Sequence, residues 1–193
     1  MKRYIKSAVS DILSEPEEIK REVARNYDTP AATLIRLTED RDPYVRKDVA
    51  ENSSAPYSAL KRLSRDPDYM VRETVANSLH TPEPILLKMA SSDKSLDLRY
   101  TALRNQCISE SKLTELASSS DWRTREAVAM NMNTPIDVLV QLSKDPHWVV
   151  KRGVASNLNT PSDCLAELSK SDNLYISSKA YDTMRGQARL GLR

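Results

Sequence analysis

The stretch VRETVANSLHTPEPILLKM, residues 71–89, decides the fold because the chain contains a second version of it. Residues 150–168 are VKRGVASNLNTPSDCLAEL. Both stretches have the form Val-x-x-x-Val-Ala, then Thr-Pro, then two apolar residues three positions apart. Repetition of this kind indicates an array of similar structural units.

The spacing of the prolines gives the period of the array. Three prolines lie 26 residues apart, and two later ones are again 26 apart: Pro30, Pro56 and Pro82, then Pro135 and Pro161. The 53 residues from Pro82 to Pro135 hold two periods and one inserted residue. We therefore predict an N-terminal capping unit, 1–28, followed by repeats that start near 29, 55, 81, 108, 134 and 160.

Each unit has the pattern of two short helices. Apolar residues four and seven positions after the proline share one helix face, as Leu86 and Met89 do. Thr is expected to be the N-cap and Pro the first helical residue. An Asp before the second helix gives another N-cap signal, and an Asn near its end suits a left-handed terminus or a bond to the next turn. Such short helices are stable only when units stack.

These patterns predict an all-α fold, a right-handed α-solenoid of about seven two-helix repeats. Residues 1–184 form one repeat array, in which Ile5, Val9, Ile12 and Leu13 belong to a diverged first helix. Residues 185–193 include Arg185, Arg189 and Arg193 with no acid, which favours a flexible basic tail.

Composition excludes several classes of protein. The 193 residues include only 3 glycines and no phenylalanine, which disfavours glycine-rich phosphate loops and sheet folds. The net charge of +2 is too small to indicate nucleic acid or a membrane surface. Cys107 and Cys164 lack metal-ligand spacing, and no signal peptide or membrane span is expected. We expect a cytoplasmic protein without a metal or cofactor.

The stretch DPDYMVRETVANSLHTPEPILLKM, residues 66–89, closely resembles units of the leucine-rich repeat variant (LRV) family and is similar to HEAT-like repeats. The resemblance extends from about Ile19 to about Lys179 and implies a right-handed helical solenoid. The insertion near 95–98 and the missing Thr-Pro near Ser109 depart from the pattern and predict a kink. No cysteine precedes Cys107, so the cysteine-rich cluster-binding segment of some LRV proteins does not carry over.

Acidic and basic residues recur six positions apart, in Asp40/Arg46, Asp66/Arg72, Asp93/Arg99 and Asp145/Lys151. One interpretation is a row of cations for phosphates. The favoured interpretation is structural and follows the resemblance to HEAT repeats, in which the Asp and Arg of adjacent units bond to each other.

Bulky residues recur near the start of each second helix: Tyr69, Leu96, Trp122, Trp148 and Leu174, with Tyr44 close by. They predict packing between repeats or, as the alternative, a ladder that contacts a ligand. Packing is the favoured interpretation.

Basic residues recur on the first helices of the N-terminal half: Arg36, Lys61, Arg62 and Lys88, with Arg41 and Arg65 nearby. The matching later positions are Glu115, Gln141 and Glu167. A docking surface for an acidic partner and an ordinary solvated face both fit this pattern, and the solvated face is favoured.

The function expected from these features is a non-enzymatic scaffold that binds another protein. The candidate partner-binding residues are Arg36, Lys61, Arg62, Lys88, Tyr69, Trp122, Trp148, Arg125, Lys151 and Arg152. The alternative is binding of a nucleic-acid backbone, in the manner of HEAT-like DNA-processing proteins, through Arg99, Arg104, Arg123, Arg125, Lys151 and Arg152. His80 and His147 lie in different units and suggest no catalytic group.

Overall fold

The structure is a computed structural model that describes residues 12–191. Within this range it contains one 3-10 helix, η1 (Ile12–Ser14), thirteen α-helices and no strand. The first helices of the units are α3 (Ala31–Leu37), α5 (Tyr57–Leu63), α7 (Glu83–Ser92), α9 (Glu110–Leu116), α11 (Ile136–Leu142) and α13 (Ser162–Leu168). The second helices are α2 (Glu17–Arg25), α4 (Pro43–Glu51), α6 (Tyr69–Asn77), α8 (Leu96–Arg104), α10 (Trp122–Met130), α12 (Trp148–Ser156) and α14 (Leu174–Leu190).

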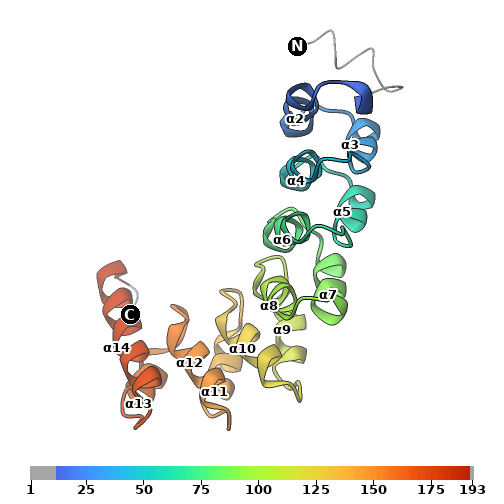
Figure 1. Ribbon diagram of the computed structural model, residues 1–193. Coiled ribbons are helices and arrows are strands. Elements are labelled where there is room, and N and C mark those ends of the chain that lie inside the picture. The colour runs from blue at the N-terminus through green and yellow to red at the C-terminus, as the bar shows by residue number, and fades with distance from the viewer. Residues whose placement is uncertain (1–11, 192–193) are drawn as a thin grey trace. The chain divides into compact units, whose positions relative to one another are not determined.

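The predicted all-α repeat architecture is therefore confirmed, with every predicted repeat start followed by a helix pair. The chain divides into two compact units, Met1–Ala102 (unit 1) and Leu103–Arg193 (unit 2). In unit 1 the second helices α2, α4 and α6 lie side by side in one layer, and α3 and α5 lie in the other (Figure 1). Unit 2 repeats this arrangement with α10, α12 and α14 in one layer and α11 and α13 in the other. Ile5 and Val9 of the predicted capping helix lie outside the described residues.

The core lies between the two layers of each unit. Nearly all the apolar anchors predicted on the first helices are buried, including Leu34, Leu60, Leu86, Leu139 and Leu165; Leu116 is half-buried. The valines of the second helices are buried with them, for example Val71 and Val75. Each fully buried leucine or valine contributes about 1.5–3 kcal/mol relative to an exposed one, so stacking supplies the stability that the short helices lack alone.

The predicted caps of the first helices are wrong. The N-cap is the proline itself, as at Pro30 and Pro82, with no side-chain cap bond. The threonine hydroxyl instead donates backward to the carbonyl of the preceding second helix, as Thr81 Oγ1 does to Val75 O at 2.7 Å. Thr29, Thr134 and Thr160 make the same bond. Each hydroxyl therefore gives a helix-end carbonyl a donor; the carbonyls of Val23, Val128 and Val154 also accept a backbone amide.

The predicted Asp caps of the second helices are confirmed at α4 and α10, where Asp42 and Asp121 cap, but the prediction from the Asp-Pro pairs at Asp66 and Asp145 is wrong. Asp68, and not Asp66, caps α6 by accepting the amide of Met70. His147, and not Asp145, caps α12 through Nδ1, which accepts the amide of Val149 at 3.3 Å. Asp66 and Asp145 are unable to cap these helices because they lie two residues earlier, where each accepts the amide of the capping residue.

A ladder of asparagines connects successive second helices. Asn157 Nδ2 donates to Ala129 O and Asn131 O, each at 2.9 Å, and its Oδ1 accepts the amide of Asn159. Asn52 and Asn131 make the same pair of bonds one repeat back. The asparagines are extended rather than left-handed, as Asn52 is with a φ of −72°. The predicted bond to the following turn is confirmed, and the side chain also ties each repeat to its predecessor.

The predicted Asp–Arg ladder is confirmed. Arg46 donates to both carboxylate oxygens of Asp66 in the next repeat, from Nε at 2.7 Å and from Nη2 at 2.9 Å. Its Nη1 donates to Asp40 O at 2.8 Å within its own repeat. Equivalent rungs are Lys20–Asp40, Arg72–Asp93 and Arg125–Asp145. The six-residue spacing therefore brings each arginine of these rungs to a backbone carbonyl in its own repeat, while its ion-pair partner is in the next one.

The rung at Asp145 keeps its carboxylate ionised although it is buried. Burial opposes ionisation, but hydrogen bonds from Arg125 and from the backbone amide of His147 outweigh it, so the pKa of Asp145 is lowered from its ordinary value. A carboxyl whose pKa is lower in the folded state than in the unfolded state stabilises the fold at pH values above its unfolded pKa. This stability is lost as the pH falls through the lowered folded value.

One position of the ladder in unit 2 lacks its acid. Lys151 occupies the basic position of α12, and the position that carries Asp66 or Asp145 in other repeats is Ser171. Ser171 Oγ still accepts a hydrogen bond from the backbone amide of Asn173, as the aspartates do from the equivalent amides. It has no second oxygen that could pair with Lys151.

Replacing Ser171 by aspartate is therefore expected to add a rung with Lys151. The gain in the free energy of unfolding should be at most about 1 kcal/mol, because the site is only partly buried. It is measured by chemical denaturation with and without the substitution. The same substitution in a Lys151→Ala background is the control, and an equal gain there would contradict the ion pair.

The C-terminal segment differs from the predicted flexible tail. Helix α14 continues to Leu190 and ends at Gly191, which has a φ of +69°. Gln187 Nε2 donates to Leu158 O and Thr160 O at 2.9 and 2.8 Å, and Thr183 occupies the asparagine position by donating to Ala155 O. These bonds to the preceding repeat keep the end of α14 helical, although its residues lack the repeat motif.

Candidate functional site

The bulky residues at the start of the second helices are mostly exposed, but Trp122 and Trp148 also contact rings of the next repeat, so the predicted packing between repeats is confirmed at these two positions. Tyr69, Trp122, Trp148 and Leu174 each directly follow the N-cap residue of their helix. Tyr69 is 44% exposed and Trp148 is 41% exposed, whereas Trp122 is half-buried. Tyr44, Leu96 and Leu174 are exposed as well. The core is filled by leucines and valines of other helix positions, so these large side chains remain available for contact.

Unit 2 has two pairs of contacting rings and an exposed leucine, which together we call the aromatic edge: Trp122, His147, Trp148, Leu174 and Tyr175. The rings of Trp122 and His147 stack with centroids 4.2 Å apart and an interplanar angle of 4°. The rings of Trp148 and Tyr175 lie 5.9 Å apart at 36°. Each contact joins neighbouring repeats, so the rings are held in place before any partner arrives.

Arginines cover part of the aromatic edge. Arg123 Cζ lies 4.4 Å from the Trp122 ring centroid, and Arg152 Cζ lies 5.9 Å from that of Trp148. Arg152 also donates to Glu126 Oε1 at 2.8 Å. These cation–π contacts hold the indoles and give the edge a positive rim.

The two other basic residues predicted as binding groups in unit 2 differ from each other. Arg125 belongs to the ladder, with its side chain 14% exposed and Nε 2.6 Å from Asp145 Oδ2. Lys151 is half-buried and forms no ion pair within residues 12–191. Lys151 is therefore the candidate for a charge contact beside the aromatic edge, and Arg125 has a structural role.

On the first helices of unit 1 an acid neutralises part of the predicted basic face. Glu39 accepts hydrogen bonds from Arg36 and from Arg62, the latter at 2.8 Å. The bond from Arg62 and its charge hold the pKa of Glu39 below its ordinary value. Lys61 and Lys88 are exposed and have no ion pair in the described part of the chain. Part of this basic face is therefore neutralised by Glu39, and the rest, at Lys61 and Lys88, keeps its positive charge.

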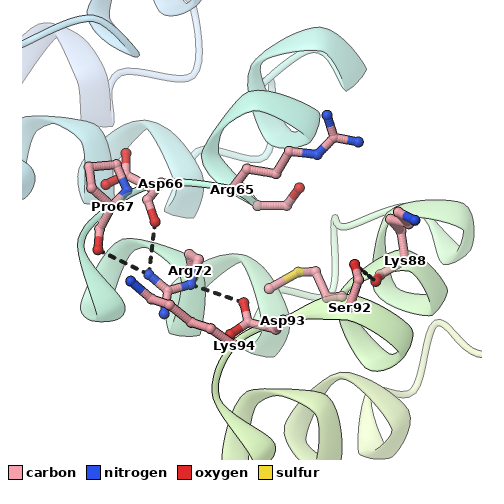
Figure 2. Close-up of a pocket in the computed structure, with 10 residues that line it drawn as sticks. Arg65, Asp66, Pro67, Arg72, Lys88, Ser92, Asp93 and Lys94 are labelled. Carbon is pink, nitrogen blue, oxygen red and sulfur yellow. Dashed lines mark hydrogen bonds and ion pairs between the residues drawn. The ribbon is translucent and has the colours of Figure 1, made fainter.

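A pocket of about 240 Å³ lies on unit 1 where α5 and α7 end (Figure 2). It is lined by Ser64, Arg65, Asp66, Pro67, Arg72, Lys88, Met89, Ser92, Asp93 and Lys94. Lys88 is thus the predicted site residue that borders a cavity.

The described residues contain no group of three or more histidine, cysteine or acidic side chains that could hold a metal ion. Neither do they contain a helix long and apolar enough to cross a membrane.

Three residues of these surfaces were missed from the sequence. Tyr175 follows the repeated bulky position by one residue, and His147 substitutes for the usual aspartate cap, so neither falls in the stripe. Glu39 lies outside the apolar pattern. A search of the 26-residue period for aromatic residues beside the stripe could have found Tyr175, but the contacts of His147 and Glu39 needed the fold.

The comparisons with known proteins agree with this architecture. The chain is similar to a solved structure described as a leucine-rich repeat variant with a novel repetitive protein structural motif. The two are 23% identical, the match covers 92% of this chain and 72% of that one, and the TM-score is 0.58. No family model matches the chain, and no curated protein does. The resemblance inferred from the repeat motif is confirmed at the level of the fold, and the chain is an all-helical repeat protein with the fold of a leucine-rich repeat variant.

Proposed function

We propose that the chain is a non-enzymatic scaffold that recognises another protein through the aromatic edge of unit 2. The observation that carries the proposal is the exposure of Trp148 and Tyr175 in a preformed cluster. Tryptophan, tyrosine and arginine are the residues that most often dominate protein interfaces, and rings already fixed in place lose little entropy on binding. Stacked repeats also offer an extended surface rather than a closed site.

The charge pattern favours a protein over a nucleic acid as the partner. A groove for a phosphate backbone needs arginines and lysines that are free to replace counterions. Arg125, Arg152 and Arg123 are instead paired with Asp145, Glu126 and Asp121, which leaves Lys151 without an ion pair among the described residues. Arg123 itself lies over Trp122. The proposal assigns no catalytic role, because the most deeply buried carboxylates of the edge repeats belong to ion pairs between helices.

The test is the double variant W148A/Y175A. Partners are captured from host lysate with the wild-type chain and with the variant, each with and without nuclease. We expect a captured protein that resists nuclease and binds the variant at least about 100-fold more weakly, since hot-spot residues contribute ~2–4 kcal/mol each.

Tyr181→Ala is the matched control for this experiment. Tyr181 is exposed on the same helix, α14, and makes no ring contact with the aromatic edge within residues 12–191. It should bind as the wild type does. Capture that disappears with nuclease, or that W148A/Y175A leaves unchanged, would exclude this function for the edge.

A further inference from the structure

The pocket at the ends of α5 and α7 lies wholly in unit 1 and shares no residue with the aromatic edge. Its lining comes from two adjacent repeats, with Arg65, Asp66 and Pro67 after α5 and Asp93 and Lys94 after α7. Figure 2 shows Arg72 reaching toward both groups of residues. Met89, which is buried, adds an apolar wall.

The acids of this pocket are already neutralised from within. Asp66 is engaged by both Nε and Nη2 of Arg46, and Asp93 Oδ2 accepts Nε of Arg72 at 2.9 Å. Arg72 Nη1 further donates to Asp66 O and Pro67 O. The two carboxylates and two guanidiniums therefore balance each other and leave no net negative charge in the pocket.

The carbonyls at the helix ends are also satisfied by groups other than the basic side chains. Ser64 Oγ donates to Lys61 O, and Ser92 Oγ donates to Lys88 O, as drawn in Figure 2. The amide of Asp93 donates to Met89 O. The basic side chains at the rim are consequently not needed as helix C-caps.

Three basic side chains at the pocket have no acid. Arg65, Lys88 and Lys94 are exposed, and none of them forms an ion pair among residues 12–191. Because the paired groups balance, these three leave the pocket with an excess of positive charge at its mouth.

A comparison with the preceding repeat explains the excess. There Glu39 occupies the position 23 residues before Arg62 and accepts its hydrogen bond. One period later the same two positions are Arg65 and Lys88. An arginine thus replaces the acid that would neutralise the lysine, and the second base repels the first rather than pairing with it.

We infer that this pocket binds the carboxylate of an acidic side chain in a segment of a partner protein. A glutamate suits it, because three cations surround its carboxylate and the Met89 wall accepts its methylene groups. The inference rests on the proposed function, since it supplies a second contact for a protein partner. It uses unit 1, whereas the aromatic edge uses unit 2.

The experiment titrates the full chain into a fluorescein-labelled oligoglutamate peptide at low salt and follows fluorescence anisotropy. We expect saturable binding that weakens as salt is added. Arg65→Glu restores the acid of the preceding repeat beside Lys88 and should weaken binding roughly tenfold or more. Lys88→Met with Lys94→Met removes two cations without adding an acid and should weaken it as well.

Lys179→Glu is the matched control, because it makes the same change of charge on an exposed position of α14. It should leave peptide binding unchanged. Equal weakening by Lys179→Glu and Arg65→Glu, no binding to the wild type, or equally tight binding of an oligothymidine probe would overturn the inference.

The two proposals fail separately. W148A/Y175A should bind oligoglutamate as the wild type does, so loss of partner capture with intact peptide binding affects only the aromatic edge. The converse outcome is also distinct. If partner capture depends on Trp148 but Arg65→Glu leaves peptide binding unchanged, the aromatic edge is supported and the pocket is excluded as a binding site.

Discussion

Replacing Asp93 by alanine is expected to lower the free energy of unfolding by about 3–5 kcal/mol, the cost of removing one partner from a buried ion pair. The side chains of Arg72 and Asp93 are 4% and 3% exposed, and their pair is the most buried rung of the ladder. Without Asp93 the guanidinium stays buried, held by Asp66 O and Pro67 O, with its charge uncompensated. The amide of Ser95 loses its acceptor as well.

Equilibrium unfolding in urea, followed by helical circular dichroism, measures this loss. Asp93→Asn removes the charge but keeps one acceptor oxygen, which can serve Arg72 or the amide of Ser95, so its loss should be smaller than that of Asp93→Ala. Asp121→Ala is the exposed control and should cost about 1 kcal/mol or less, mainly through the lost cap of α10. A loss below about 1 kcal/mol in Asp93→Ala would show that the rung does not hold the repeats together.

Replacing Asn157 by alanine is expected to cost about 3 kcal/mol. Asn157 is 2% exposed and satisfies three backbone groups: Ala129 O, Asn131 O and the amide of Asn159. A buried polar group left without its partner costs ~1–3 kcal/mol, and water reaches this site poorly because the neighbouring repeat covers it. The loss should appear in urea unfolding as a lower midpoint with an unchanged slope.

Asn159→Ala is the comparison for Asn157. Asn159 is exposed, and its Nδ2 donates to a single carbonyl, Met132 O. Its replacement should cost well under 1 kcal/mol, because water can satisfy that carbonyl. If the two variants lose equal free energy of unfolding, the asparagines stabilise the chain through their bonds within the turns and not through the burial of their side chains.

The 26-residue spacing was enough to predict the helix pairs, because only a stack of equal units can bury one apolar stripe from each short helix. The spacing of acids and bases likewise predicted the ladder, and the rungs at Asp66 and Asp145 confirm it. Two-helix units, core leucines and the ladder all follow from local periodicity. The division of the chain into domains stays a prediction.

The positions of the surface groups were decided by the tertiary structure. From the sequence, a bulky residue at the start of a helix can pack inward or lie outward. In the structure Trp148 lies outward, while Leu139, Val150 and Leu165 are buried. The role of the threonines depends on the fold as well, since Thr81 donates to the carbonyl of Val75 in the preceding helix instead of capping its own.

By itself, the sequence of this chain determined the repeat, the helix pairs and the stripe that each helix buries, because these depend on residues a few positions apart. Only the tertiary structure decided that Tyr175 meets Trp148 across 27 residues and that Glu39 neutralises Arg62 across 23. It also decided that Arg65 and Lys88 share one pocket without an acid. Such contacts join different repeats, and their partners are set by the stacking of whole units rather than by the preference of any single residue.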